Sequence, residues 1–258
     1  MRLVSYNILD GGKGRADPLA EVIVAQQPDV VALVEADDHD VVDRIADRLK
    51  MDRIMVAGRR HGAAVLCRWT IVESINHALL HEEFSDCLLE AQLAGPDGQA
   101  WTVAAVHLHP HATDADERRR EREVDAILRI FSAHRRDGVP HILAGDFNAN
   151  SPIQDVKPQD CKPRTRKEIE ANGGVLPRRA IAKLLEGGYV DTLDVVQPAA
   201  ARSAGSFTTQ YPGQRVDFIF THGIEPARLS EARIEHDRLA RYASDHFPVM
   251  VQIDPKRD

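Results

Sequence analysis

Short apolar runs of strand length recur along the whole chain, and this pattern constrains the fold more than any other feature. Val30–Val34, which is bordered by Asp29 and Glu35, is one example, and residues 102–106, which are followed by His107, are another. Such runs suit buried strands and fall far short of the ~20 residues that a membrane-spanning helix needs. Segments with helical spacing, such as residues 39–50, lie between them. The alternation predicts an α/β or α+β sandwich, one domain over residues 1–258, without a membrane span.

The expected elements follow from this periodicity. Strands are predicted at residues 2–8, 29–35, 63–67, 71–75, 87–94, 101–108, 141–144, 216–221, 227–234 and 247–253. Helices are predicted at residues 19–27, 39–50, 114–136 and 178–186, with Asp17 and Pro18 starting the first and Thr113 capping the third. The turn Gly95-Pro96-Asp97-Gly98 predicts a hairpin.

Two charged segments allow two interpretations each. The Glu and Arg run at residues 117–123 predicts a solvated helix face, and the alternative is that its arginines contact phosphate. Residues 148–172 are predicted to be irregular and carry five basic residues among prolines: Lys157, Lys162, Arg164, Arg166 and Lys167. This segment is either a substrate loop or a flexible surface insertion.

Composition limits the class of partner and the compartment. The formal net charge of −7 disfavours non-specific duplex binding, which depends on Lys and Arg, although a local basic surface is compatible with it. Cys67, Cys87 and Cys161 are widely spaced and odd in number, so we expect buried free thiols rather than disulfides. The first residues lack the apolar core and cleavage site of a signal peptide, so a cytoplasmic location is expected.

Polar residues stand at the ends of predicted strands in six places. They are Asn7, Glu35, His107 with His109, Asp146 with Asn148, Arg215 with Asp217, and Asp245 with His246. Strand ends present side chains to a shared cleft. Mg²⁺ prefers carboxylate and amide oxygens, and a histidine beside a carboxylate supplies a charged donor for phosphoryl chemistry. One cluster alone could be a turn, but six together predict a divalent-metal-dependent phosphoesterase.

These clusters resemble a known family. The segments in question are Tyr6-Asn7, Glu35, Val106-His107-Leu108, Gly145-Asp146-Phe147-Asn148, Arg215-Val216-Asp217 and Ser244-Asp245-His246. In this order they are similar to the endonuclease/exonuclease/phosphatase superfamily, which includes the DNase I-like nucleases. Residues 62–68 resemble its glycine-led strand, with Cys67 where Ser is usual. The resemblance implies a four-layer sandwich of two packed mixed β-sheets flanked by helices.

The resemblance also implies roles for the site residues. Asn7, Glu35 and Asp245 would hold Mg²⁺ or Mn²⁺, with Asp245 as a further or outer ligand. Asp146 would orient or deprotonate the attacking water. The remaining residues would act on the phosphate and leaving group: Asn148 and His107 contacting phosphate, and His246 with Asp217 stabilising the transition state or protonating the leaving oxygen. Asp146 and His246 both stay candidates for the proton transfer.

Departures from the family pattern narrow the substrate. Leu9 stands where exonuclease III-like and abasic-site endonucleases carry Asp, which disfavours abasic-site repair. The inositol phosphatase pattern of Trp and Cys is absent near Arg215. The leading prediction is a phosphodiesterase or nuclease that hydrolyses P–O bonds by in-line attack of an activated water. A small-molecule or lipid-headgroup phosphatase or phosphodiesterase is next, and a non-catalytic binding module is the alternative from another class.

Three smaller questions complete the predictions. A zinc site from His107, His109 and His111 is disfavoured because Pro110 interrupts the strand. Phe207, Thr208, Thr209 and Tyr211 could line the cleft or pack in a loop, and packing is slightly favoured. Asp191 and Asp194 receive no role. The expected partner is a phosphate-ester substrate, with nucleic acid among the candidates, and the sequence predicts no oligomeric state.

Overall fold

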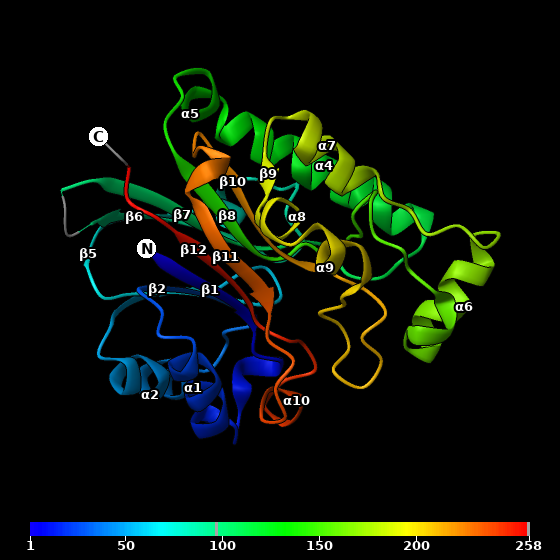
Figure 1. Cartoon of the computed structure of the whole chain (residues 1–258), viewed down its shortest axis with the longest axis horizontal. Coiled ribbons are helices and arrows are strands. Elements are labelled where there is room, and N and C mark those ends of the chain that lie inside the picture. Colours follow the sequence, from blue (N-terminus) through cyan, green and yellow to red (C-terminus); the bar gives the residue numbers. More distant parts are fainter. Residues whose placement is uncertain (96–97, 257–258) are drawn as a thin grey trace.

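The computed structural model describes residues 1–95 and 98–256, which form two mixed six-stranded sheets (Figure 1). The first sheet has the order β11-β12-β1-β2-β4-β3. Its strands are β1 (Arg2–Asn7), β2 (Val30–Val34), β3 (Asp52–Val56), β4 (Ala63–Cys67), β11 (Leu229–Ile234) and β12 (Val249–Ile253). The second sheet has the order β5-β6-β7-β8-β10-β9. Its strands are β5 (Thr70–Asn76), β6 (Cys87–Ala94), β7 (Ala100–His107), β8 (His141–Asp146), β9 (Val190–Asp191) and β10 (Asp217–His222).

Helices lie outside the two sheets. The α-helices are α1 (Ala16–Ala25), α2 (His39–Leu49), α3 (His77–Leu80), α4 (Asp114–Ile130), α5 (Ser132–Arg136), α6 (Pro163–Ala171), α7 (Arg179–Glu186), α8 (Thr192–Val196), α9 (Pro198–Ser203) and α10 (Ala240–Ala243). Short 3₁₀ turns are η1 (Asp10–Gly12), η2 (Pro158–Asp160) and η3 (Pro226–Arg228). In the described part of the chain, no helix combines the length and the apolar character that a membrane crossing requires.

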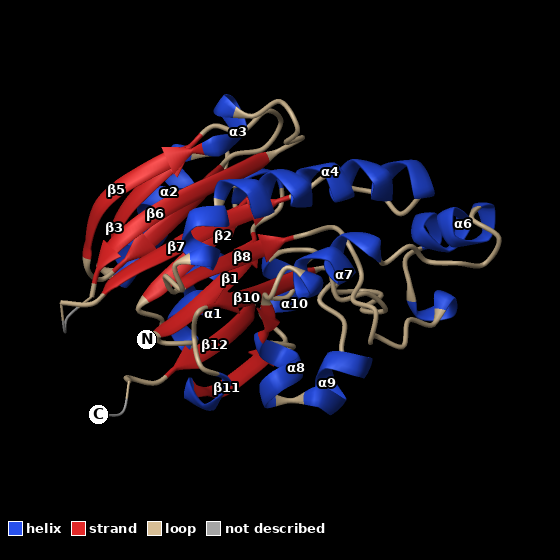
Figure 2. Ribbon diagram, turned by 90° about the horizontal axis from the view of Figure 1, so that it is seen from above, coloured by secondary structure: helices blue, strands red, loops and turns tan. Residues whose placement is uncertain are grey.

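Alternation along the central strands builds two apolar layers. On β7, Val103 and Ala105 belong to the cluster between the sheets, whereas Ala104 and Val106 belong to the cluster under α4 and α7. Successive side chains of a strand point to opposite faces, so a strand covered on both sides must be apolar throughout. Figures 1 and 2 show α1 and α2 outside the first sheet and α4 and α7 outside the second. The predicted four-layer sandwich is therefore confirmed.

Several predicted boundaries are wrong for identifiable reasons. Helix α1 begins at Ala16, before the predicted cap, because the first helical turn tolerates Pro18 without a hydrogen-bond donor. The predicted helix at residues 114–136 is interrupted at Phe131, whose backbone leaves helical geometry while its ring stacks on His141. Strand β3 was missed because it is a partly exposed edge strand that begins with the charged residues Asp52 and Arg53 and has only three apolar residues. Strands β6 and β7 pair as predicted, and Pro96 and Asp97 of their turn lie outside the described residues.

The prediction of a solvated face for the Glu and Arg run on α4 is wrong in part. Glu117, Arg120 and Glu123 are buried, and they hold loops in place. Glu123 accepts the backbone N–H groups of Ser85 and His109, at 2.7 and 2.8 Å. Arg120 pairs with Glu117 at 2.8 Å and donates to the carbonyl of His109 at 2.9 Å. Buried charges persist when they are paired and hydrogen-bonded. The two contacts with His109 fix the loop that follows β7, and the contact with Ser85 holds the loop before β6.

The segment predicted to be irregular at residues 148–172 contains a helix. Helix α6 spans Pro163–Ala171 and buries Thr165 and Ile169. Only two buried residues mark its inner face, which is too weak a period to be recognised in the sequence. The three cysteines are buried and free, as predicted.

His141, at the start of β8, gives the fold a dependence on pH. Its ring is buried between a hydrogen bond from Nδ1 to the Val139 carbonyl (2.9 Å) and a contact of Nε2 with the Tyr189 hydroxyl (2.8 Å). Burial lowers the pKa of His141 to about 4. The unfolded chain therefore binds this proton near pH 6.5, whereas the folded protein does not.

We expect this difference to destabilise the protein as the pH falls from about 6.5 toward 4. Between pH 7.5 and 5 the lost stability due to His141 is about 2 kcal/mol. His141→Gln lowers stability at every pH but flattens this dependence, whereas His39→Gln, at an exposed position, leaves it unchanged. Urea unfolding at several pH values measures the difference. Parallel curves for wild type and His141→Gln would contradict the assignment.

Candidate active site

Strand register brings three predicted residues into one row. His107 at the end of β7 is opposite Asp146 at the end of β8, and Asp146 is opposite Asp217 at the start of β10. In the other sheet, Asn7 ends β1 opposite Val34 of β2, so Glu35 follows at the same edge. Both rows lie at one end of the sandwich. Strand ends separated by up to about 210 residues in sequence, from Asn7 to Asp217, therefore meet at one site.

The buried carboxylate of Asp146 lies at the centre of this site. Its Oδ2 accepts a hydrogen bond from the Asn7 amide at 3.1 Å and lies 3.6 Å from His107 Nε2 and 3.7 Å from His246 Nε2. Its Oδ1 accepts the backbone N–H of Asn148 at 2.8 Å. Burial raises the pKa of Asp146 to about 6, although both histidines act in the opposite direction. The group is thus more basic than an ordinary aspartate and still ionised at pH 7.5.

His246 is held as a cation by its neighbours. Its Nδ1 lies 2.8 Å from Oδ2 of Asp217, which leaves Nε2 facing Asp146. Burial opposes the charge, but the carboxylates of Asp217 and Asp146 outweigh it and raise the pKa of His246 to about 10. The Phe207 ring packs against the imidazole, with 4.5 Å between ring centroids. Phe207 also borders the cavity, so it contributes to the site as well as to loop packing.

Glu35 and Asn7 form the opposite wall. The Glu35 backbone is left-handed (φ 54°), which turns its carboxylate back toward the site. The carboxylate accepts the Asn7 amide at 3.0 Å and the Asp10 N–H at 2.8 Å. Burial raises its pKa, but His107 and these donors outweigh burial, so the net pKa is lowered and Glu35 is charged at neutral pH. The Asn7 oxygen accepts the Leu9 N–H at 3.0 Å, so its amide nitrogen faces the carboxylates.

The side chains of Asp245 and Asn148 differ in their partners. Asp245 is 38% exposed, and its buried Oδ1 accepts no hydrogen bond from the described residues but lies 3.9 Å from Nε2 of His246. The Asn148 amide donates to the Leu108 carbonyl at 2.9 Å, and its backbone is left-handed (φ 49°). Within residues 1–95 and 98–256, two sets of His and acidic side chains have donor atoms within 4.8 Å of one another. One set is Asp146, Asp217 and His246, and the other is Asp10, Glu35 and His61.

The donor set suits a hard divalent cation. Glu35 and Asp245 offer anionic oxygens that face the cavity, and Asp245 Oδ1 is buried without a donor among the described residues. Carboxylate oxygens are ligands that Mg²⁺ and Mn²⁺ accept. His109 is occupied by Asp116, at 3.0 Å from its Nε2. Among the described residues, His107, His109 and His111 form no common set of donor atoms within 4.8 Å.

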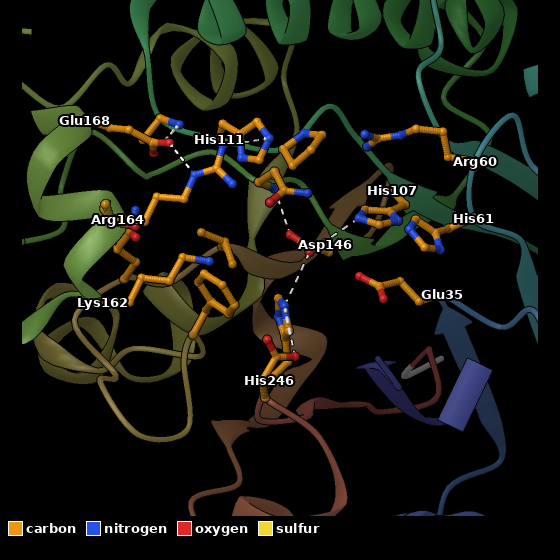
Figure 3. A pocket seen from close by; sticks show the side chains of 18 residues that line it. Glu35, Arg60, His61, His107, His111, Asp146, Lys162, Arg164, Glu168 and His246 are labelled. Atoms are coloured by element: carbon orange, nitrogen blue, oxygen red, sulfur yellow. Dashed lines mark hydrogen bonds and ion pairs between the residues drawn. The ribbon is translucent and has the colours of Figure 1, made fainter. Parts of the chain in front are cut away.

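Figure 3 shows the side chains that line the cavity at this site, with Asp146 between His107 and His246 and with Glu35 beside His107. Its volume is about 250 Å³. Sequence reasoning missed Arg60 and His61, which come from the loop between β3 and β4 and also border the cavity. His61 lies just before the predicted glycine-led strand, at 2.8 Å from Asp37. The sequence signal that could have identified His61 as a site residue is its position directly before Gly62, where the family-like strand begins.

The predicted Arg215 has a structural role. It is buried, and its guanidinium lies 2.7 Å from Asp191 and 4.4 Å from the centre of the Phe218 ring. This pair joins β9 to the start of β10 and so supports the strand that carries Asp217. Asp191, to which the sequence assigned no role, is the buried partner of this arginine.

Comparisons with known proteins agree with this architecture. A sequence model described as "Endonuclease/Exonuclease/phosphatase family" matches residues 4–246. A 3′ phosphatase from Neisseria, solved with a product DNA hairpin, is 17% identical with a TM-score of 0.73, over 98% of this chain and 99% of that chain. An AP endonuclease from Archaeoglobus fulgidus is 18% identical with a TM-score of 0.72, over 99% and 100%.

A third similar structure is a humanized TDP2 from D. rerio. It is 18% identical with a TM-score of 0.68, and the match covers 99% of both chains. At these identities the likeness concerns the fold alone. No curated protein sequence matches the chain.

Proposed function

The chain belongs to the endonuclease/exonuclease/phosphatase family, and from this premise we propose that it is a Mg²⁺- or Mn²⁺-dependent phosphodiesterase acting on small or single-stranded nucleic-acid substrates. Family members hydrolyse phosphoesters. The observation that carries the proposal is the buried Asp146 carboxylate, which faces the cavity between a fixed amide and two histidines. A protein that only binds its ligand has no need of a carboxylate held at a raised pKa.

Glu35, Asn7 and Asp245 are the proposed metal-holding residues, and Asn7 would ligate through its oxygen, which also accepts the Leu9 N–H. Glu35 is charged at neutral pH, and Asp245 Oδ1 is free of hydrogen-bond donors among the described residues. When bound, a divalent cation supplies positive charge to the phosphate oxygens as negative charge develops on them. The Asn7 amide, which bridges Glu35 and Asp146, fixes the two carboxylates relative to each other.

Asp146 is the proposed acceptor of the proton from the attacking water. With a pKa raised by burial to about 6, it is ionised at pH 7.5 and close to the basicity that a general base needs. His107 and Asn148 border the same cavity and would contact the non-bridging oxygens of the phosphate. Their hydrogen bonds would hold the phosphorus in line with the water.

His246 is the proposed donor to the leaving oxygen. Asp217 fixes its Nδ1, so the proton on Nε2 faces the cavity, and the raised pKa keeps that proton in place at neutral pH. A water-derived proton accepted by Asp146 and a proton given by His246 balance the hydrolysis of one P–O bond. The two groups lie 3.7 Å apart, so the proton can return from Asp146 to His246 after turnover.

Nucleic acid is the proposed substrate class for two reasons. The similar structures include a phosphatase with a bound DNA product and an AP endonuclease. Three cationic side chains, Arg60, Lys162 and Arg164, border the cavity although the whole chain carries a net charge of −7. These cations stand beside four carboxylates of the same cavity, Glu35, Asp146, Glu168 and Asp245, so they offer an anionic ligand individual contacts and not a net positive surface.

Phosphodiester hydrolysis is tested with bis-p-nitrophenyl phosphate and p-nitrophenyl phosphate in the presence of Mn²⁺. We expect faster turnover of the diester, and loss of turnover when EDTA removes the metal. Preference for the monoester would contradict the diesterase assignment and favour a phosphatase.

The role of His246 is tested by the dependence of activity on the leaving group. His246→Ala should lower the turnover of thymidylyl-thymidine, whose alkoxide leaving group needs a proton, by about 10²- to 10⁴-fold. The loss should be smaller for bis-p-nitrophenyl phosphate, because p-nitrophenolate leaves without a proton. His39→Ala is the control at an exposed histidine. Equal losses on both substrates would contradict the role as acid.

The metal-holding role of Glu35 is tested by thermal unfolding with and without Mn²⁺. A ligand that binds only the folded state at 100 times its Kd stabilises it by about 2.7 kcal/mol. We expect Mn²⁺ to raise the Tm of wild type and of Glu73→Gln, an exposed control on β5, but not that of Glu35→Gln. An undiminished shift in Glu35→Gln would exclude this residue as a principal ligand.

A further inference from the structure

The cations around the cavity differ in whether their charge is neutralised. Arg60 is paired with Asp86, with Nη2 2.6 Å from Oδ2. Arg164 is paired with Glu168, with Nε 2.9 Å from Oε1. Within the described part of the chain, the Lys162 ammonium has no carboxylate within 4 Å and no hydrogen-bond acceptor. Its closest recorded contact is the Phe207 ring, with Nζ 4.0 Å from the ring centre.

The surroundings of Lys162 make its free charge significant. The side chain is half-buried, and burial lowers the pKa of Lys162. Asp245 and Glu168 act against burial and raise the pKa, but neither forms an ion pair with the ammonium. A partly desolvated ammonium without a direct ion pair gains more from an anion that reaches it than an exposed lysine would. The position therefore offers one positive charge that is not held in an ion pair.

Lys162 lies away from the metal-holding side of the cavity. Figure 3 shows Lys162 and Arg164 on the side opposite Glu35, with Asp146 and His246 between them. Phe207 connects the two regions, because its ring contacts the His246 imidazole on one side and Lys162 on the other. When the reacting phosphate lies at Asp146, the Lys162 side of the cavity is therefore open to another part of the substrate.

The cavity has room for this second group. Its volume of about 250 Å³ compares with about 30 Å³ for one water molecule in the liquid, and a phosphate group has only five heavy atoms. Beyond Lys162 the cavity continues into a groove that Lys162 and Asp245 also border. Tyr211 and Tyr242, which are 41% and 71% exposed, lie along this groove and offer aromatic faces to a base.

We propose that Lys162 binds a second phosphate of the substrate, adjacent to the one that is hydrolysed, and that the enzyme selects nucleotide substrates carrying two phosphates. The assignment rests on the proposed hydrolysis at Asp146 and names the substrate class of the same site. Arg164, whose Nη2 lies 3.2 Å from His111, forms the outer wall behind Lys162 and adds a partly neutralised charge. The adjoining groove would receive the nucleoside.

The remaining basic residues of the segment provide the control. Lys157, Arg166 and Lys167 are exposed, and none of them borders the cavity or the adjoining groove. Lys167 is on the same helix α6 as Arg164. Lys167→Met therefore removes the same charge from the same segment without touching the proposed phosphate site.

Calorimetric binding of thymidine 3′,5′-bisphosphate and thymidine 5′-monophosphate tests the assignment without requiring turnover. A charge-assisted hydrogen bond corresponds to a preference of about 10-fold or more in Kd for the bisphosphate. We expect this ratio in wild type and in Lys167→Met, and a ratio near one in Lys162→Met. Lys162→Arg should keep most of the preference, which shows that charge rather than packing is responsible. Thermal unfolding confirms that each variant is folded.

A second pair of ligands, glucose 1,6-bisphosphate and glucose 1-phosphate, identifies the source of the phosphate. If only the thymidine pair shows the preference for the bisphosphate, the substrate class is nucleotides. If both pairs show it equally, the substrate class is bisphosphates in general and not nucleotides. A ratio near one in wild type for both pairs, or an unchanged ratio in Lys162→Met, overturns the role of Lys162. Absence of hydrolysis together with a retained ratio would contradict the proposed reaction and leave the phosphate site standing.

Discussion

The carboxylate of Asp146 is the interaction on which the site depends, because it is the point where the two sheets share a polar contact. It accepts the Asn7 amide from the first sheet and lies within 4 Å of His107 and His246. Its place in the row is set by parallel pairing with β7 and antiparallel pairing with β10. A one-residue slip of either pair would turn a side chain of this row to the opposite face. The apolar alternation that fixes strand register therefore also fixes the chemistry.

Polar and strained groups concentrate where the sandwich is open at this end. Left-handed backbone conformations occur at Glu35, Asn148, Asp10 and His111, all at or beside the cavity. For residues other than glycine such conformations cost about 1 to 2 kcal/mol each, and they persist where the surrounding structure determines them. Here the apolar layers provide the rigidity, and buried ion pairs such as Arg120 with Glu117 hold the loops. The stability of the core thus supports a site that is itself unfavourable to form.

Much of this arrangement could be predicted from the sequence because its signals are local. Apolar runs with polar ends placed Asn7, Glu35 and Asp146 at strand termini, and the resemblance put them in one site. Lys162 could not be placed, because its contact with the cavity depends on where α6 packs, which is decided by residues far along the chain. The buried Glu123 was also misjudged, since its partners are backbone groups of two other loops. The sequence shows that this part of α4 is rich in charged residues, but it does not show which loops pack against them.

The central claim is that Asp146 is retained for chemistry and not for stability. The measurement that tests it most directly compares wild type with Asp146→Asn, in turnover of bis-p-nitrophenyl phosphate with Mn²⁺ and in free energy of unfolding at pH 8. Because burial disfavours the ionised carboxylate, the account predicts turnover lower by about 10²- to 10⁴-fold with a free energy of unfolding no lower than that of wild type. Retained turnover, or loss of turnover accompanied by a clear loss of stability, would contradict it.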